Sequence, residues 1–405
     1  MTKPLLVILI TVALDAVGIG LIFPVLPSLL KDVTHVGDVT PYIGIMMALY
    51  AAMQFVFAPV LGALSDSHGR RPVLLISLIG AMTNYLFLAF APSLWLLLLG
   101  RALAGLTSAN MSVAAAYITD TSSEEMRPRR FGLLNAMFGI GFILGPVLGG
   151  LLGDHWVRLP FVAAAVLTGI NFLLCILALP ESRSPAGENV RVRALNPLLP
   201  LRWAFTIEGV LPLVFIFFIF SGLGEAYGTC WALWGNDVFQ WNGLWIGLSL
   251  GTYGTCQTLA QALLPGPATK RLGERGAILT GIVSACAALA VFAGAKQGWM
   301  VFAAMPLLAL GGIGVPALQS LATRQVSEAE QGKFQGVLQS AVSLASILAP
   351  LGFSSAYLSL RSDWPGAIWL LVAALYGIGA IMILRLRFEK KEPLAASRQA
   401  RDSSA

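Results

Sequence analysis

Charged side chains are scarce in this sequence. Asp, Glu, Lys and Arg together make up 11% of the 405 residues, whereas hydrophobic residues make up 57% and the mean hydropathy is +0.78. A soluble protein carries roughly 25% charged residues. Because these polar side chains are too few to cover a surface facing water, the composition excludes an ordinary soluble domain and indicates a protein surrounded by lipid.

Cysteine and histidine are also few. The four cysteines lie inside apolar runs without a CxxC pair, which favours helix packing over a disulfide framework. The three histidines are scattered, so no metal site is predicted. The net charge is +6, but the basic residues sit in short loops rather than on one continuous face, which argues against a nucleic-acid partner. No phosphate-binding loop of the GxxxxGKS or GxxxxGKT type occurs, so we expect no cofactor and no ATP-driven step.

Long apolar runs dominate the chain. A helix that crosses a bilayer needs about 20 mostly apolar residues, and the runs found here do not alternate as strands would. The first run carries Asp15 and precedes many others, so it is predicted to be an uncleaved helix rather than a signal peptide. The twelve predicted spans are 5–29, 42–64, 73–92, 95–119, 131–153, 160–179, 210–234, 243–264, 276–295, 299–322, 334–358 and 366–386.

The chain also carries an internal repeat. Two short loops framed by glycine, Gly62–Arg71 and Gly266–Arg275, are 204 residues apart, about half the chain length. A repeat of that length is typical of transporters and excludes solenoids and propellers. The sequence therefore predicts an all-α membrane protein in which twelve transmembrane helices form two six-helix halves. The same offset relates Gly18 to Gly222, Gly20 to Gly224, Gly132 to Gly336 and Pro146 to Pro350.

Lys and Arg are distributed unevenly between alternate loops. If both termini are cytoplasmic, 21 of the 26 lie on the cytoplasmic side, four lie outside and Arg101 falls within a span. The positive-inside rule therefore predicts cytoplasmic termini. The predicted domains are an N-terminal half at 1–179, a proline-containing cytoplasmic linker at 180–209, a C-terminal half at 210–388 and a cytoplasmic tail at 389–405.

Two carboxylates lie inside predicted spans. Asp15 is about ten residues into the first span, where a buried charge is costly and a functional role is the default expectation. By the repeat offset, Glu225 lies roughly 9 Å further outward in the other half. A carboxyl in such a site can be protonated reversibly, so one of the two can carry a proton while the other binds substrate. The alternative for each is a structural hydrogen bond to a neighbouring helix.

Arg101 is the buried positive charge of the span 95–119. It either balances Asp15 or Asp120, or holds substrate, or extends to the membrane boundary. Asp120 and Arg127 border the cytoplasm, where they are either partners in a gate or solvated charges.

Other polar or aromatic side chains within the spans are candidates for a substrate cavity, and the alternative for each is a bond between helices. These candidates are Gln54, Asn84, Asn110, Trp231, Gln257, Gln261 and Gln319.

The first glycine-framed loop contains Gly62, Asp66, Gly69, Arg70 and Arg71. Its glycines permit a tight turn, and Asp66 can accept hydrogen bonds from a helix N-terminus or pair with an arginine across the cytoplasmic face. Such a contact, held in one state and broken in another, is a gate. The alternative is a short turn whose arginines only set the topology.

A stripe of small residues follows in the fifth predicted span. Gly141, Gly145, Gly149 and Gly150 recur at helical spacing, which predicts close packing against another helix. Pro146 weakens that helix and is expected to seal the periplasmic half of the membrane domain.

Three motifs together resemble those of the major facilitator superfamily. Gly62-x3-Asp66-x2-Gly69-Arg70-Arg71 is similar to its signature loop, and Gly100-Arg101-x3-Gly105 to its helix-4 motif. Gly141-x3-Gly145-Pro146-x2-Gly149-Gly150 resembles its antiporter motif in helix 5. The resemblance covers the whole chain and implies a secondary transporter, not an enzyme. Its substrate site would lie between the two halves and would open alternately to each side.

A narrower resemblance is to the bacterial tetracycline efflux pumps within that superfamily. It is carried by Leu14–Pro27, Ala48–Gln54, Arg70–Leu75 and Pro316–Gln319. It implies a proton-coupled antiporter in the bacterial inner membrane that exports a small amphipathic drug, tetracycline or a related compound, free or as a metal chelate. The alternatives are a multidrug or metabolite exporter that does not act on tetracycline, and a proton-coupled uptake symporter.

Four positions depart from the pattern of those pumps. Their acidic residues in helices 3 and 9 fall at Asn84 and Ala285, and the helix-8 histidine of several members falls at Gln257. Conversely, Glu225 stands where the pumps tend to have glutamine. The frame therefore matches better than the acidic residues that the family ties to coupling and substrate.

Overall fold

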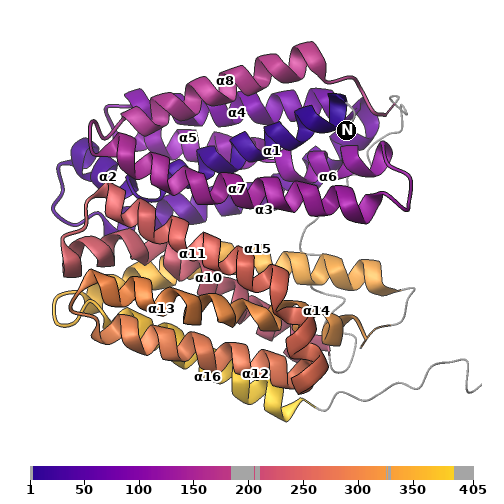
Figure 1. Cartoon of the computed structure of the whole chain (residues 1–405). Coiled ribbons are helices and arrows are strands. Elements are labelled where there is room, and N and C mark those ends of the chain that lie inside the picture. Colours follow the sequence, from indigo (N-terminus) through magenta and orange to yellow (C-terminus); the bar gives the residue numbers. More distant parts are fainter. Residues whose placement is uncertain (1–2, 184–204, 206–209, 325, 327–329, 387–405) are drawn as a thin grey trace, which may run out of the picture.

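The described part of the chain forms two helical bundles that lie side by side (Figure 1). The computed structural model describes residues 3–183, 205, 210–324, 326 and 330–386, and within these it contains helices and no strand. Most of the predicted linker and the whole predicted tail lie outside the described residues. The prediction of an all-α membrane protein is confirmed.

The N-terminal half comes first. It contains α1 (Lys3–Ile22), α2 (Leu26–Thr34), α3 (Thr40–His68), α4 (Arg70–Phe90), α5 (Leu94–Thr107), α6 (Asn110–Asp120), α7 (Arg127–Gly153) and α8 (Leu159–Ala178).

The C-terminal half repeats the pattern. It contains α10 (Val210–Phe239), α11 (Gly243–Leu263), α12 (Pro265–Gly294), α13 (Gly298–Leu310), the 3-10 turn η2 (Gly311–Ile313), α14 (Gly314–Thr323), α15 (Gln331–Leu360) and α16 (Ala367–Arg385).

Eleven helices among the described residues are long and apolar enough to cross a membrane, when α5 with α6 and α13 with α14 are each counted as one. The predicted span that is not among these eleven is 243–264, which forms α11, a helix of 21 residues with several Gly, Thr and Gln side chains. It packs along α7 of the other half, where small and polar side chains meet protein rather than lipid. Its lower hydropathy therefore follows from its place between the halves.

The internal repeat is visible in the backbone. In the described part of the chain, Gly69 and Gly273 are the glycines with positive φ, at 102° and 70°, and they are 204 residues apart. A residue with a Cβ is strained in that conformation, so each loop needs glycine at this turn. The fourth spans of the two halves also break at matching places, at Ser108 and Ala109 in one half and at Gly311–Ile313 in the other.

The prediction of one continuous first helix over 5–29 was wrong. α1 ends at Ile22, three residues of turn follow, and α2 begins at Leu26. Pro24 and Pro27 lack a backbone N–H, so proline interrupts the hydrogen-bond ladder here and then fits the first turn of the new helix. A hydropathy window does not detect this break because all of these residues are apolar.

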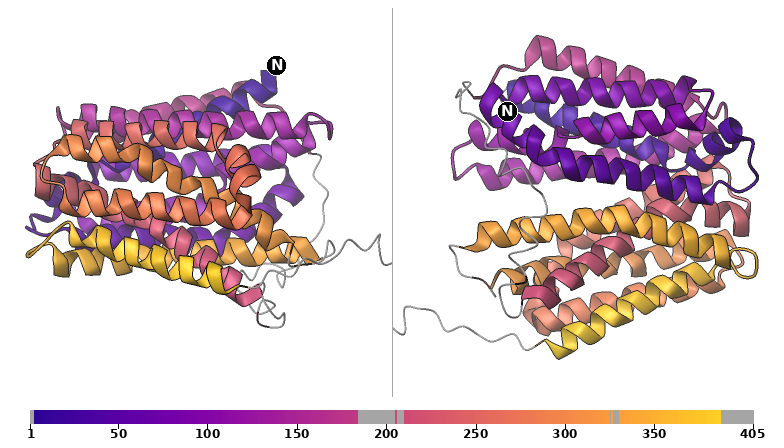
Figure 2. Two further views of the ribbon diagram at one scale, coloured as in Figure 1. Left: turned by 60° about the horizontal axis from the view of Figure 1, so that its bottom comes forward. Right: turned by 180° about the vertical axis from the view of Figure 1, so that it is seen from behind.

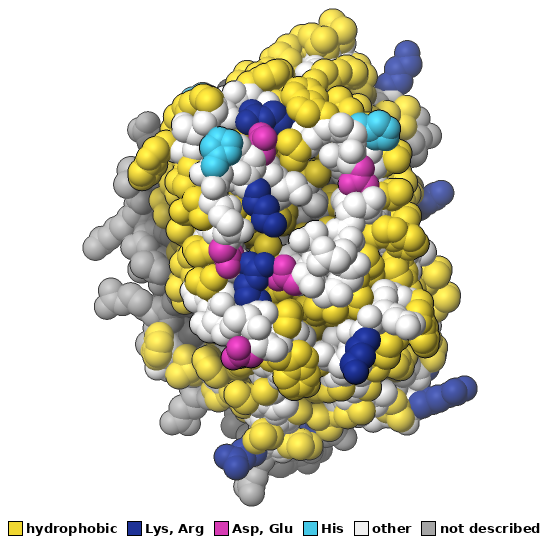
Figure 3. Space-filling view, turned by 90° about the vertical axis from the view of Figure 1, so that its left-hand side faces the viewer, with side chains coloured by type: hydrophobic (Ala, Val, Ile, Leu, Met, Phe, Trp, Pro, Cys, Tyr) yellow, Lys and Arg dark blue, Asp and Glu magenta, His cyan; other side chains and the backbone are white. Residues whose placement is uncertain are grey.

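The two halves contact each other mainly through two helix pairs, α3 with α15 and α7 with α11 (Figure 2). The described hydrogen bonds between the halves lie at the end of the molecule that carries α2, called here the α2 end. Figure 3 views this end, where acidic and basic side chains lie close together near the middle of the face among hydrophobic and uncharged groups.

Candidate functional site

A cavity of about 450 Å³ lies between the halves and is called here the central cavity. α1, α3, α4, α5, α6 and α7 of the N-terminal half line it, and α10 contributes Glu225 from the other half. Its size falls in the range of pockets that hold drug-sized molecules. Both carboxylates predicted from the sequence, Asp15 and Glu225, therefore face one chamber, while their roles in coupling stay a prediction.

Asp15 is held by one side-chain hydrogen bond. Asn110 at the start of α6 donates its Nδ2 to Asp15 Oδ1 over 2.7 Å. The Asn110 Oδ1 atom is buried and has no partner in the described structure. Since an unpaired buried acceptor is costly, this oxygen is available to a bound donor.

The break in the fourth span builds a second polar group in the central cavity. Ser108 lies between α5 and α6, and its hydroxyl is 2.8 Å from the Tyr50 hydroxyl and accepts a hydrogen bond from Gln54 Nε2 at 2.9 Å. Tyr50 and Ser108 were missed by the sequence analysis. The spacing of Tyr50 and Gln54, one turn apart on α3, was the available signal.

Arg101 is not paired with either carboxylate that the sequence suggested. Its guanidinium lies 4.6 Å from the centroid of the Tyr50 ring and contacts the Met47 sulfur, and its Nε is buried without a partner. Among the described residues, Asp120 pairs with Arg70 instead. Arg101 lines the central cavity, so its charge is directed toward a ligand rather than toward a structural ion pair.

Glu225 is held within its own half. Ser346 of α15 donates its hydroxyl to Glu225 Oε1 over 2.6 Å. This bond ties α10 to α15, and it is a contact that would weaken if the carboxyl took up a proton at that oxygen.

The first glycine-framed loop forms an ion-pair cluster inside the N-terminal half. Arg70 is 7% exposed and bonds Asp66 at 2.7 Å and Asp120 at 2.8 Å. Arg183 also bonds Asp66, at 3.0 Å. Glu181 accepts from the Arg70 backbone N–H at 2.8 Å, so a carboxylate caps the N-terminus of α4.

Asp66, Arg70, Arg71 and Asp120 of the predicted gate residues join that cluster, and Glu181 was not predicted. Arg71 donates its backbone N–H to the Glu181 carboxylate. Arg127 stays outside the cluster and lies near Glu124, with 3.9 Å between their charged atoms. Gly69 forms the turn, whereas a Cβ at Gly62 would meet nothing within 4 Å, so Gly62 is not required for close packing in this state. The gating role of the cluster stays a prediction, because none of these contacts crosses to the other half.

The C-terminal half carries the same pair with the charges exchanged. Glu274 corresponds by the repeat to Arg70, and Arg324 corresponds to Asp120. Arg324 bonds Glu274 at 2.9 Å, and Ser320 also donates to that carboxylate. The ion pair therefore occupies the same place in both halves, but the acidic and basic residues have exchanged positions.

An ionic latch closes the α2 end. Arg361, just after α15, bonds Asp38 of the N-terminal half at 2.8 Å and Asp237 of its own half at 2.7 Å. Partial burial opposes ionisation of Asp38, but hydrogen bonds from Thr40 and the Arg361 charge outweigh it and hold the pKa of the Asp38 carboxyl below its usual range. This latch was not predicted from the sequence because its charges lie in loops or at a helix end, where solvated side chains are common.

A second closure lies where α7 meets α11. Asp154, the residue after α7, accepts from the backbone N–H groups of Gly243 and Leu244 at 2.8 and 3.0 Å. A carboxylate from one half thus caps a helix of the other.

The glycine stripe of α7 has two faces. Gly141, Gly145 and Gly149 pack against the α1 backbone; a Cβ at Gly145 would lie 2.6 Å from the Val17 carbonyl oxygen. Gly150 instead contacts the backbone at Gly243 across the halves. Close packing is therefore observed, while sealing by Pro146, which α11 contacts at Gly247, stays a prediction.

The remaining cavity candidates are dispersed. Gln54, Asn84 and Asn110 line the central cavity, and Gln257 lines a different one inside the C-terminal half. Trp231 is 3% exposed, donates to Ser249 and packs among aromatic rings, so it belongs to the core rather than to the central cavity.

Two further candidates lie away from the central cavity. Gln319 bonds Gln335 of α15 at 3.1 Å. Gln261 lies one turn beyond Gln257 on α11 and is exposed.

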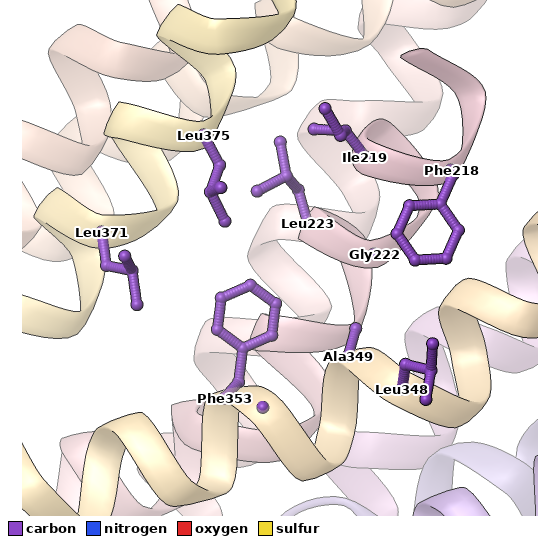
Figure 4. Close-up of a pocket in the computed structure, with 10 residues that line it drawn as sticks. Phe218, Ile219, Gly222, Leu223, Leu348, Ala349, Phe353, Leu371 and Leu375 are labelled. Carbon is purple, nitrogen blue, oxygen red and sulfur yellow. The ribbon is translucent and has the colours of Figure 1, made fainter. Parts of the chain in front are cut away.

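An apolar groove on the flank of the C-terminal half is not a candidate for this site. α10, α15 and α16 line it with Phe, Leu, Ile, Ala and Gly side chains (Figure 4). Leu348 and Leu371 on its rim are 49% and 37% exposed. It has no polar side chain to orient a ligand, and its rim is suited to hydrocarbon.

Comparison with known proteins agrees with this architecture. The profile of the Major Facilitator Superfamily matches residues 8–252 and 213–404. The solved structure of the nucleoside transporter NupG superposes with a TM-score of 0.79 at 14% identity, covering 96% of this chain and all of that one. The human organic anion transporter MFSD10 gives 0.68 at 21% identity, covering 94% and 99%. These two likenesses show the fold.

The sequence relatives are closer. The class C tetracycline resistance protein of Escherichia coli is 48% identical over 92% of this chain and 94% of its own length. The class G protein of Vibrio anguillarum is 43% identical over 96% and 98%. The chain therefore belongs to the Major Facilitator Superfamily and, within it, to the family of the bacterial tetracycline resistance proteins.

Proposed function

We propose that this protein exports a tetracycline-type amphipathic drug from the cytoplasm in exchange for protons. The observation that carries the proposal is the central cavity, where Asp15 and Glu225, one from each half, face the same space. The names of the relatives supply the drug class. The proposed cycle contains no covalent step, and the drug is carried free or as a metal chelate.

The proton and the drug compete for the carboxylates in this scheme. Protonation of Asp15 or Glu225 from outside removes negative charge from the cavity and favours release of the drug. Deprotonation toward the cytoplasm restores that charge and favours capture. Arg101, Asn84 and the free Asn110 oxygen add hydrogen-bonding partners for the oxygen-rich face of the drug.

The proposed orientation follows from the Lys and Arg distribution, with both termini in the cytoplasm of a bacterium and the chain in its inner membrane. The α2 end then faces the periplasm. The latch and the Asp154 cap lie at that end, which supports the proposal that this state is closed toward the periplasm.

One observation favours a second candidate, an exporter of a different amphipathic drug. Ala285, where the family has an acid, is 1% exposed, and its Cβ lies 3.0 Å from the place a Cβ would take at Gly311. Position 285 therefore supplies no charge beside Gly311, so charge recognition in this half is proposed to differ from that in the relatives.

Everted membrane vesicles test the proposal. Wild-type protein should accumulate tetracycline with saturation and sensitivity to an uncoupler. Asp15→Asn or Glu225→Gln should abolish accumulation if that residue couples the proton. Full accumulation by both variants would show that neither carboxylate is required for proton coupling. If the wild type does not accumulate tetracycline, tetracycline is not the substrate, and other amphipathic drugs would be tested in the same vesicles.

A further inference from the structure

A second cavity, of about 120 Å³, lies inside the C-terminal half and is called here the C-half cavity. α10, α11, α12 and α16 surround it together with the break between α13 and α14. Three tyrosines, Tyr227, Tyr253 and Tyr376, line it, and no charged side chain does. Because Glu225 and Tyr227 are about 200° apart on α10, the central cavity and the C-half cavity lie on opposite sides of that helix.

The internal repeat relates the two cavities. Each is lined by the interruption in the fourth span of its half, and an interrupted helix at corresponding positions of two repeats is a marker of transporter binding sites. Phe23, Ala104, Ser108 and Asn110 line the central cavity, and Tyr227, Leu308, Gly312 and Gly314, each 204 residues further on, line the C-half cavity.

Two polar atoms of the C-half cavity lack partners. Tyr227 Oη and Gln257 Oε1 are each accessible over less than 1 Å² and have no hydrogen bond in the described structure. An unpaired buried group of this kind costs free energy and calls for an explanation. One group accepts a hydrogen bond and the other both donates and accepts, so a hydroxyl in contact with both would satisfy them.

The shape of the cavity restricts that hydroxyl to a small ring. An engineered cavity of about 150 Å³ in another protein holds benzene, so this volume is close to that of one six-membered ring. Tyr227 and Tyr253 stack on each other, with 6.0 Å between their ring centroids and 16° between their planes, and both rings border the cavity. Aromatic walls favour a planar ring, and the absence of charge among the lining residues favours a neutral one.

We propose that the C-half cavity is a second binding site, which holds a neutral, phenol-sized ring whose hydroxyl donates to Gln257 Oε1 and accepts from Tyr227. The binding itself does not depend on the proposed export of tetracycline. Only the assignment of the ring to the transported drug rests on that function.

Fluorine NMR of 4-fluorophenol with the full-length protein in lipid nanodiscs tests the proposal. Wild-type protein should broaden the ligand signal beyond empty nanodiscs. Tyr227→Phe and Gln257→Leu each remove one hydrogen-bonding group and should weaken binding about fivefold. Thr258→Val is the matched control, because Thr258 neighbours Gln257 on α11 but bonds the Gly254 carbonyl oxygen and should leave binding unchanged.

Thermal unfolding without ligand separates binding from structure. Because both variants remove polar atoms that have no partner, their unfolding temperatures should equal or exceed that of the wild type. Equal broadening by the wild type and both variants would overturn the proposal. A similar loss in Thr258→Val, or binding lost only together with stability, would overturn it as well.

Vesicle transport distinguishes the two sources of such a ring. If it belongs to the drug, Gln257→Leu should raise KM for tetracycline about fivefold with little change in kcat. If it belongs to a separate phenolic molecule, KM should be unchanged, and 4-fluorophenol should alter uptake by the wild type but not by the variant. If the wild type does not transport tetracycline, the proposed function is wrong. The NMR comparison would still show whether the C-half cavity binds a phenol.

Discussion

At the scale of the residue, Asp15 and Arg101 face the same chamber without pairing. Asp15 is bonded to Asn110, and Arg101 lies over the Tyr50 ring. An ion pair between them would neutralise both charges and leave neither available to a proton or a drug. Their separation keeps one site for each, at the cost of an unpaired Arg101 Nε.

We expect Asn110→Leu to lower transport without removing the carboxylate. The variant deletes the only described side-chain hydrogen bond to Asp15, so the carboxylate loses its fixed position, and transport should fall about tenfold. Asp15→Asn should be more severe, on the order of 100-fold, because it removes the titrating group itself. Initial rates of drug uptake in vesicles measure both. Equal rates for Asn110→Leu and the wild type would contradict the positioning role.

At the scale of the element, the spans were predictable because each needs a long apolar run, which the sequence displays directly. Their interruptions were not. Gly311 and Gly312 break the fourth span of the C-terminal half, and proline breaks the first span after Ile22, yet both places are apolar and pass a hydropathy window. The carboxylates of the central cavity were predicted because a lone charge is conspicuous in such a run. The tyrosines of the C-half cavity were not, since an aromatic residue there is ordinary core.

The glycine stripe of α7 gives a prediction at this scale. A side chain at Gly150 would meet the backbone at Gly243, so Gly150→Val should separate α7 from α11 and disfavour closure of the α2 end. Overpacking of about 1–3 kcal/mol would shift the balance of states roughly 5- to 150-fold. Spin-label distances across that end should lengthen. Gly139→Ala on the same helix is the control, because its Cβ would lie 4.0 Å from the nearest atom. Unchanged distances in Gly150→Val would contradict the close-contact role.

The two ion pairs related by the repeat should differ in how much transport depends on them. Arg70 is 7% exposed and pairs with two carboxylates, whereas Arg324 is 68% exposed and pairs with one. Arg70→Ala removes a buried cation that bonds two carboxylates and leaves Asp120 without its described ion pair, so it should lower transport about tenfold or more. Arg324→Ala removes an exposed guanidinium, and Ser320 still donates to Glu274, so transport should change less than about threefold. Vesicle uptake at matched expression measures both variants. Equal losses would show that the exposure of the arginine does not determine how much transport depends on each pair.

For the molecule as a whole, the described hydrogen bonds and ion pairs between the halves are concentrated at one end. The latch on Arg361 and the Asp154 cap join the halves at the α2 end, whereas the Arg70 and Arg324 pairs each stay within one half. A molecule closed at one end, with its cavity between the halves, is suited to alternating access by rocking.

The latch predicts a dependence on pH. Because the pKa of Asp38 is lowered in the closed state, its contribution is complete above the usual pKa of a carboxyl and is lost as the pH falls through the lowered value, below about pH 4. Spin labels at Val36→Cys and Asp363→Cys in a background without the native cysteines should then move apart. Arg361→Ala should separate them already at neutral pH. If Asp38→Asn leaves the pH response unchanged, Asp38 is not the group whose protonation opens the latch.

Proton movement driven by the drug alone is the most direct test of proton-coupled export through Asp15 and Glu225. Liposomes containing the purified protein and a trapped pH indicator are loaded with tetracycline and diluted into drug-free buffer without any imposed proton gradient. Antiport predicts that the lumen becomes more acidic as drug leaves, and that the change is absent in the double variant Asp15→Asn, Glu225→Gln and in liposomes without protein. A lumen that becomes more alkaline, or a pH trace equal to that of the double variant, would contradict proton-coupled export through the two carboxylates of the central cavity.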